Sequence, residues 1–171
     1  MKLILIRHGE SISNQKKVQL NNNENLLTSK GEEQAKLCGK VLSLWIGERN
    51  FKFYASTSVR ARLTAEIIKN QFDRLIQIDY DSRLIEKRSQ ESYEEVFNRF
   101  KTFIPLTSKD NINDLIVVIT HGNLIQSVIG NALSLPDCSI IETTNCGVSI
   151  IDNGRLISYN MFLHLHELSD I

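Results

Sequence analysis

The sequence contains few of the residues that mark specialised classes of protein. Its 171 residues include only three cysteines, two prolines and eight glycines. So little proline and glycine excludes a collagen-like or linker-rich chain. An odd number of cysteines without CxxC spacing argues against a disulfide framework or a cysteine-based zinc site. We therefore expect Cys38, Cys138 and Cys146 to be reduced thiols.

The chain also lacks an excess of charge and a long apolar run. Twenty Lys and Arg balance twenty Asp and Glu, so the formal net charge is zero. This balance removes the usual argument for a nucleic-acid or anionic-membrane surface. The longest apolar run, at residues 115–119, is far shorter than the roughly 20 residues of a membrane helix, and the N-terminal run is too short for a signal peptide. We expect a cytoplasmic protein that binds neither nucleic acid nor membrane.

The composition that remains is that of an ordinary globular protein, with 42% apolar and 23% charged residues. A chain of this size can bury a core that is stable without disulfides or a structural metal. No repeat, linker or low-complexity segment divides it. We therefore expect a single domain over residues 1–171.

Short apolar runs alternate with amphipathic stretches of helical length. The expected strands are residues 2–6, 51–55, 115–120 and 148–151, with a weaker one at 76–80. The expected helices are residues 30–46, 59–72, 93–104 and 123–133. This alternation predicts a three-layer α/β/α sandwich around a mostly parallel sheet. Asp152-Asn153-Gly154 between two apolar stretches predicts a C-terminal antiparallel hairpin.

Polar clusters follow three of the expected strands. They are Arg7-His8-Gly9-Glu10, residues 56–60 and Thr120-His121-Gly122-Asn123. In open α/β sheets ligands bind beyond the carboxyl ends of the strands, so these clusters are expected to converge. Two histidines and two arginines in one pocket suit a tetrahedral oxyanion. The glycines after each histidine let the backbone turn sharply, and the helices that follow add N–H groups.

This composition favours phosphoryl transfer. The oxygens of a phosphate monoester must be held and neutralised before attack, and arginine does so with a fork that never loses its charge. A neutral imidazole can then attack phosphorus and form a phosphohistidine that water resolves. A carboxylic acid usually protonates the leaving alcohol. No metal cofactor is required if the arginines supply the charge.

Four motifs together resemble the histidine phosphatase superfamily, the phosphoglycerate-mutase-like proteins with an Arg-His-Gly motif. They are residues 5–11 with Asn14, residues 27–35, residues 56–65 and residues 117–123. The resemblance spans nearly the whole chain and implies an α/β sandwich without a metal or other cofactor. The short chain resembles the phosphatase-type members.

The resemblance also implies roles for individual residues. His8 would be the phosphorylated nucleophile, and Arg7, Arg60 and His121 would complete the phosphate pocket. Asn14, Gly122 and Asn123 would assist in binding substrate. Glu86 matches the Leu-x-Glu position of the proton donor in many members. After Glu86 the sequence departs from the family pattern, and Glu91 is the competing acid.

Several functions share this set of residues. The main expectation is a metal-independent phosphomonoester hydrolase acting on a small phosphorylated metabolite. A phosphoglycerate-type mutase uses the same core, but the short chain leaves little room for the lid that mutases carry. A protein phosphohistidine phosphatase often lacks the acid. A non-catalytic phospholigand-binding domain would be expected to lose His8 or an arginine. The identity of the substrate and formation of a homo-oligomer are open.

Two further pairs carry weaker signals. His164 and His166 alternate as a metal pair would, but without a third ligand nearby they are expected to be structural. Lys16 and Lys17 could meet an anionic substrate or simply be solvated.

Overall fold

The computed structural model describes residues 1–107, 115–162 and 164–165. In chain order its elements are β1 (Lys2–Arg7), α1 (Ile12–Lys16), α2 (Ser29–Ile46), β2 (Lys52–Ser56), α3 (Val59–Lys69), β3 (Ile78–Asp81), the 3-10 helix η1 (Ser82–Leu84), α4 (Tyr93–Thr107), β4 (Leu115–Thr120), α5 (Gly122–Ala132), the 3-10 helix η2 (Cys138–Ile140), β5 (Val148–Asp152) and β6 (Arg155–Met161). Each expected strand and helix is present, with ends shifted by a few residues. The five-residue helix α1 was not expected, because it is too short to show an apolar period.

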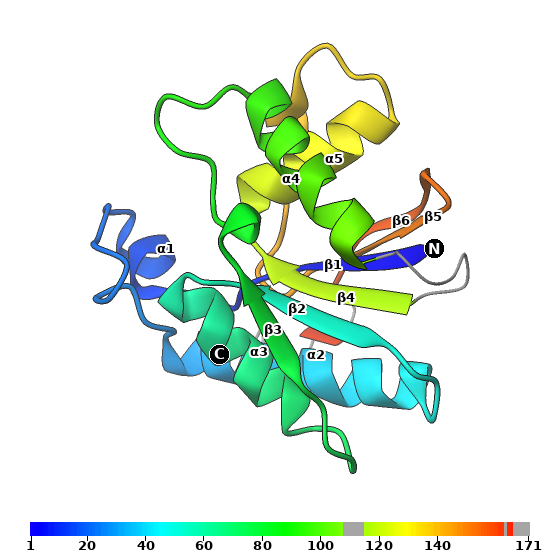
Figure 1. The fold of residues 1–171 in the computed structure, drawn as a ribbon. Coiled ribbons are helices and arrows are strands. Elements are labelled where there is room, and N and C mark those ends of the chain that lie inside the picture. The colour runs from blue at the N-terminus through cyan, green and yellow to red at the C-terminus, as the bar shows by residue number, and fades with distance from the viewer. Residues whose placement is uncertain (108–114, 163, 166–171) are drawn as a thin grey trace.

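The six strands form one sheet in the order β3-β2-β4-β1-β5-β6. Neighbours among β3, β2, β4 and β1 run parallel, whereas β5 and β6 are antiparallel additions at one edge (Figure 1). In the turn between β5 and β6, Asn153 and Gly154 have φ of 48° and 77°. Positive φ at both central residues is the geometry that Asn-Gly favours in a two-residue hairpin. The predicted mostly parallel sheet and its C-terminal hairpin are therefore confirmed.

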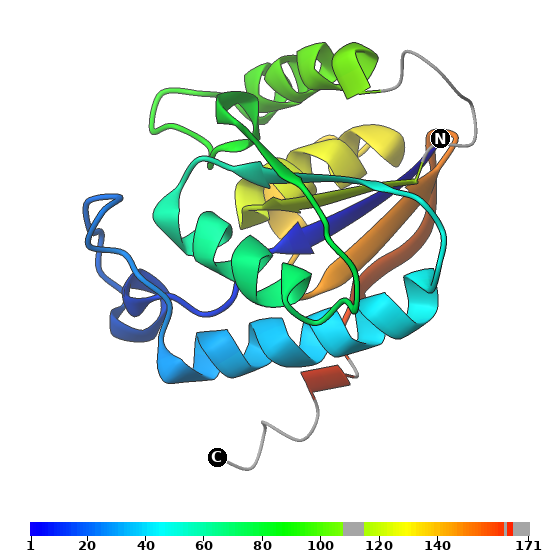
Figure 2. The same ribbon diagram turned by 60° about the horizontal axis from the view of Figure 1, so that its bottom comes forward.

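Helices cover both faces of the sheet, with α2 and α3 on one side and α4 and α5 on the other (Figures 1 and 2). In β1, Ile4 and Ile6 belong to the core beneath α2 and α3, while Leu3 and Leu5 belong to the core beneath α4 and α5. Residues of a strand alternate between the two faces, so a strand covered on both sides is apolar throughout. This explains the unbroken apolar runs and confirms the three layers.

Two features of α2 follow from its first residues. The Thr28 hydroxyl accepts a hydrogen bond from Gly31 N at 3.0 Å and so caps the helix. A Cβ on Gly31 would lie 2.0 Å from the carbonyl oxygen of Glu10. Only glycine lets the loop after β1 pack this closely on α2.

Membrane insertion was not expected from the sequence. Among the helices that the structure describes, none is long and apolar enough to cross a bilayer. The single domain over residues 1–171 stays a prediction.

Candidate active site

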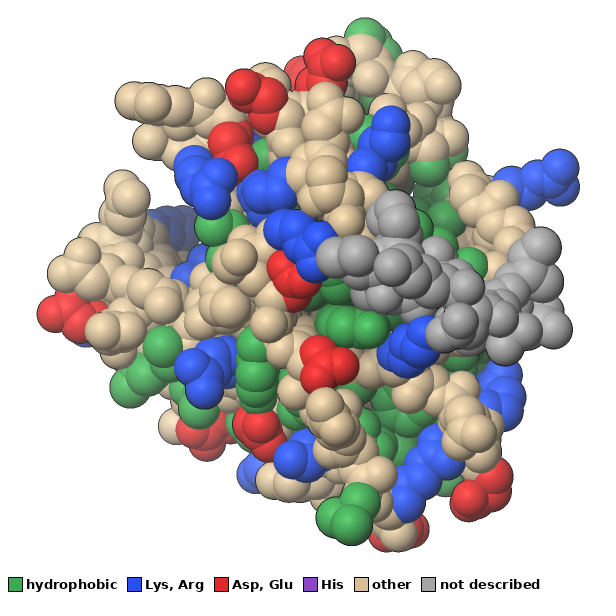
Figure 3. All heavy atoms as spheres, viewed as in Figure 1, with side chains coloured by type: hydrophobic (Ala, Val, Ile, Leu, Met, Phe, Trp, Pro, Cys, Tyr) green, Lys and Arg blue, Asp and Glu red, His purple; other side chains and the backbone are tan. Residues whose placement is uncertain are grey.

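Three parallel strands bring the predicted polar clusters to one edge of the sheet. Arg7 at the end of β1 is in register with Thr120 at the end of β4, and His8 N donates to Thr120 O at 2.9 Å. The residues that follow these strands are therefore neighbours. The rings of His8 and His121 lie edge to face, with centroids 5.1 Å apart. Figure 3 shows a hollow beside this edge, between the segment that carries α1 and the segment that follows η1, with Lys and Arg side chains along it.

His8 is almost fully buried and its two ring nitrogens have different partners. Nε2 accepts a hydrogen bond from Arg60 Nε at 3.0 Å, and Nδ1 lies 2.8 Å from Gly9 O. Since arginine can only donate, Nε2 carries the lone pair and Nδ1–H donates to Gly9 O. Burial holds the pKa of His8 well below its usual range, and the charges of Arg60 and Arg7 lower it further. His8 is thus a neutral imidazole whose nucleophilic nitrogen faces a guanidinium.

His121 is buried in the same way, with its tautomer reversed. Its Nδ1 accepts from Arg60 Nη2 at 3.0 Å, so Nε2–H donates to Ser56 Oγ at 2.8 Å. Burial lowers the pKa of His121 well below its usual range, with further lowering from His8 and Arg60. Arg60 therefore bridges two neutral histidines. This geometry places His121 as the group that orients Arg60.

Arg7 lies next to Gly122 with part of its guanidinium unsatisfied. Its Nη1 donates to Thr143 O at 2.5 Å, but its buried Nε has no hydrogen-bond partner among the described residues. A Cβ on Gly122 would lie 2.8 Å from Thr143 Oγ1 and 3.5 Å from Arg7 Nε. Burial lowers the pKa of Arg7. A buried donor without a partner beside a second arginine is a place where an anion would be stabilised.

Glu86 is the carboxylate that counters these arginines. It raises the pKa of both Arg7 and Arg60 against the lowering that burial causes. Its Oε1 accepts from the backbone N–H of Asn123 at 3.2 Å and of Lys87 at 3.0 Å. The first of these donors lies at the start of α5, where the helix dipole favours a negative group.

A family model of the histidine phosphatase superfamily (branch 1) matches residues 3–89 and 85–155. The chain belongs to the histidine phosphatase superfamily. A search of curated proteins finds no match.

Solved structures of named phosphatases share the fold of this chain. A phosphoserine phosphatase of Entamoeba histolytica in complex with phosphoserine is 21% identical, with a TM-score of 0.78 over 96% of this chain and 98% of that one. A mycobacterial glucosyl-3-phosphoglycerate phosphatase in complex with VO3 is 19% identical, with a TM-score of 0.76 over 93% and 98%. A putative α-ribazole-5′-P phosphatase of Escherichia coli is 19% identical, with a TM-score of 0.73 over 94% and 96%.

The competing candidate for the acid, Glu91, forms its contacts elsewhere. Its side chain is 13% exposed and forms ion pairs with Arg99 at 2.9 Å and Arg88 at 3.0 Å. Burial alone would raise the pKa of Glu91, but hydrogen bonds from Arg99 and Arg88 outweigh it and lower the pKa. Arg99 and Arg88 hold both oxygens of the Glu91 carboxylate, whereas the charge of Glu86 reaches Arg7 and Arg60, so the geometry favours Glu86 as the acid.

The predicted assisting residues are close to the histidines but are engaged within the protein. Asn14 Oδ1 accepts from Ser11 N and Oγ, at 3.1 and 3.0 Å, and from Asn145 Nδ2 at 3.3 Å. Asn145 also donates to His8 O at 2.9 Å. The backbone N–H of Asn123 is used by Glu86. Roles of Asn14, Gly122 and Asn123 in binding substrate stay predictions.

Sequence reasoning did not assign roles to several residues that hold the site together. Ser56 accepts from His121, and Thr64 Oγ1 accepts from Gly9 N at 3.0 Å. Thr143 and Asn145 contact Arg7 and the backbone of His8 from the loop before β5. Ser56 and Thr64 lie inside the motif at residues 56–65, which was a usable signal. The loop residues lie in no such motif.

The remaining pairs contribute little to the site. His164 Nε2 lies 3.2 Å from Cys146 O, while His166 falls outside the described residues. Lys16 and Lys17 are exposed at the end of α1, where Lys17 has a φ of 53°. Within the part of the chain that the structure describes, no three His, Cys, Asp or Glu side chains cluster as metal ligands would. Cys38, Cys138 and Cys146 are free thiols, as expected.

Proposed function

We propose that this protein is a phosphomonoesterase that acts through a phosphohistidine at His8, with Glu86 as general acid. The single observation that carries the proposal is the tautomer of His8. A neutral imidazole whose Nε2 lone pair faces a cationic pocket is a nucleophile set beside a binding site for a phosphoryl group. In this proposal Arg7, Arg60 and His121 form that site.

In the first half-reaction the phosphoryl oxygens take the donors of Arg7 and Arg60. The unsatisfied Nε–H of Arg7 gains an acceptor, and Arg60 exchanges its bond to His8 for one to the substrate, which frees the lone pair. Nε2 of His8 then attacks phosphorus, the bond to the ester oxygen breaks, and Glu86 gives its proton to that oxygen. The Nδ1–H···O=C bond to Gly9 stabilises the positive charge that develops on the ring.

In the second half-reaction water attacks the phosphohistidine. Glu86, now a carboxylate, removes a proton from this water, the P–N bond breaks, and the electron pair returns to Nε2 of His8. Inorganic phosphate leaves and both groups regain their starting protonation states. The arginines neutralise the charge of the transferred group in both steps, so the cycle uses no metal.

The substrate is proposed to be a small phosphorylated metabolite. The Entamoeba phosphatase that shares this fold was solved with phosphoserine and with 3-phosphoglyceric acid. The three neighbouring structures described above are phosphatases, which supports hydrolysis over the mutase reaction on the same core. A non-catalytic binding domain would need neither a nucleophile at His8 nor an acid at Glu86, and this chain has both beside the two arginines.

Hydrolysis of p-nitrophenyl phosphate in the presence of EDTA tests the proposal. We expect turnover by the wild-type protein, competitive inhibition by phosphate or vanadate, and no turnover by His8→Ala. Activity that depends on an added divalent metal, or that survives in His8→Ala, would contradict it.

A further inference from the structure

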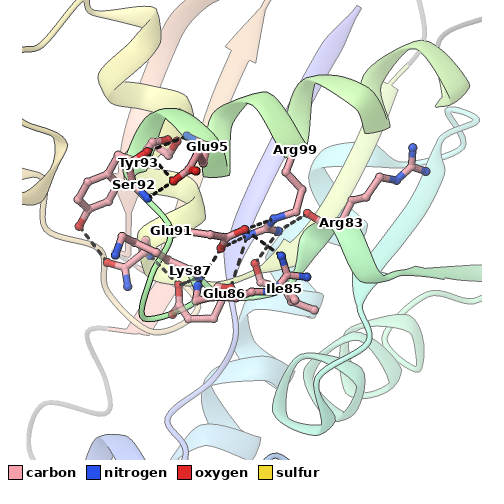
Figure 4. Close-up of polar contacts among 12 residues, drawn as sticks. Arg83, Ile85, Glu86, Lys87, Glu91, Ser92, Tyr93, Glu95 and Arg99 are labelled. Atoms are coloured by element: carbon pink, nitrogen blue, oxygen red, sulfur yellow. Dashed lines mark hydrogen bonds and ion pairs between the residues drawn. The ribbon is translucent and has the colours of Figure 1, made fainter.

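Arg99, in the second turn of α4, uses its whole guanidinium on the segment that carries Glu86. Nε and Nη2 donate to the two oxygens of Glu91 at 3.0 and 2.9 Å, and Nη2 also reaches Glu86 O at 3.5 Å. Nη1 donates to Arg83 O at 2.6 Å and to Ile85 O at 3.1 Å (Figure 4). All five N–H donors of the guanidinium therefore have acceptors. The side chain is only 12% exposed.

Glu91 completes this arrangement from the other end of the segment. Its Oε2 accepts from Arg88 N at 2.8 Å, and its own N–H donates to Arg88 O at 3.1 Å, which closes a tight turn. The Glu91 carboxylate thus ties the turn to Arg99, and Arg99 ties it to α4. Regular secondary structure does not hold residues 85–92 in place, so these side chains decide where the segment lies.

The other side of the segment contacts β4, the strand that pairs with β1 beside His8. Thr120 Oγ1 donates to Leu84 O at 2.7 Å, next to the carbonyls that Arg99 binds. Beyond these anchors the Glu86 carboxylate meets the N-terminus of α5. The place of Glu86 relative to His8 is therefore defined by Thr120 on one side and Arg99 on the other.

We infer that Arg99, with Glu91 as its counter-ion, is a positioning residue that sets the Glu86 carboxyl for proton transfer to the leaving group. This rests on the proposed function, in which Glu86 is the acid. Stability is a weak reason to keep such a pair, because a buried ion pair is often no better than apolar packing. A lysine keeps the charge but lacks the planar fork that reaches three carbonyls and a carboxylate together.

The test compares two leaving groups. An alkyl alcohol needs the proton from the acid, whereas p-nitrophenolate leaves readily without it. We would measure kcat/KM, which reports the phosphorylation step, for an alkyl phosphate and for p-nitrophenyl phosphate. The variants are Arg99→Lys, Glu91→Gln and the control Arg74→Lys. Arg74 also donates to two backbone carbonyls, those of Glu48 and Arg49, but far from the site.

For Arg99→Lys we expect kcat/KM on the alkyl phosphate to fall by about 10- to 100-fold, since a misplacement of about 1 Å can cost 10²-fold. On p-nitrophenyl phosphate the fall should stay within about threefold. Glu91→Gln should show the same contrast, and Arg74→Lys should resemble wild type on both substrates. Adding Arg99→Lys to Glu86→Gln should cause no further loss on the alkyl ester.

Parallel losses on both substrates in Arg99→Lys would overturn the inference, because they indicate a purely structural role. Retained turnover of the aryl ester shows that a variant is folded. If Arg99→Lys does not fold, Glu91→Gln decides by the same contrast. If the wild-type protein hydrolyses neither substrate, the proposed function itself fails.

Discussion

The two sides of the candidate site are built in different ways. On the nucleophile side, His8 and His121 directly follow β1 and β4, and Arg60 lies in the first turn of α3 after β2. Their places follow from the sheet register. On the acid side, Glu86 lies in an irregular segment that side chains of α4 and β4 hold. The proposed nucleophile is placed by the backbone, and the proposed acid by side-chain contacts between distant residues.

On the side of His8 the backbone itself is tightly packed. A Cβ on Gly9 would lie 2.4 Å from Gly31 O, so the loop after β1 is packed directly on α2.

Removing the nucleophile should have the largest effect. Loss of a nucleophile can cost about 10⁶-fold in kcat, so we expect His8→Ala to abolish turnover. Wild-type protein quenched in alkaline SDS should carry phosphate that is labile in acid and stable in base, as phosphohistidine is, and His8→Ala should carry none. The control His164→Gln changes a histidine outside the site and should keep both label and activity. Label that persists in His8→Ala would place the covalent step on another residue.

Removing the acid should have the next largest effect, and only for poor leaving groups. Glu86→Gln keeps the size of the side chain but cannot donate a carboxylic proton. We expect a loss of about 10²–10⁴-fold in kcat/KM on an alkyl phosphate and a small loss on p-nitrophenyl phosphate. Glu94→Gln, exposed in the first turn of α4, is the matched control. Equal losses on the two esters would mean that Glu86 shapes the pocket without transferring a proton.

The difference between the His8 side and the Glu86 side of the site also shows which features the sequence can predict. Unbroken apolar runs and Asn-Gly identify the strands and the hairpin, because these signals lie within a few residues of each other. The convergence of His8, Arg60 and His121 follows from a general property of parallel sheets. The contacts of Arg99 and Asn145 could not be predicted, because they depend on how segments distant in sequence meet. For the same reason the sequence alone left Glu91 as a competitor of Glu86, and the role of Glu86 as the acid stays a prediction.

Changing the arginine that bridges the histidines tests the nucleophile side more finely. Arg60→Lys keeps a positive charge but cannot donate to His8, His121 and a phosphoryl oxygen from one planar group. We expect kcat/KM to fall by about 10²–10³-fold on both esters, since one transition-state donor is worth about that much. Arg62→Lys, exposed on the same helix with its guanidinium over the Tyr80 ring, should be near wild type. A loss confined to the alkyl ester would instead assign Arg60 to the acid.

The smallest expected effect is on stability and concerns the buried histidines. Burial and the nearby His8, Arg60 and Arg7 hold the pKa of His121 well below 6.5. In the unfolded chain its pKa is near 6.5, so below that pH only the unfolded state gains the proton. The stability that a neutral His121 contributes is thus fully present above about pH 6.5 and is lost as the pH falls.

Urea unfolding of wild type and His121→Asn between pH 7.5 and 5 measures this loss. The difference in free energy of unfolding between the two proteins should be constant above about pH 6.5. Below it, wild type should lose about 1.4 kcal/mol more than the variant per pH unit. The other three histidines are present in both proteins, so the difference between the two isolates His121. A difference that stays constant down to pH 5 would mean that His121 takes up its proton in the folded state. The assignment of His8 and His121 as two neutral histidines would then be wrong.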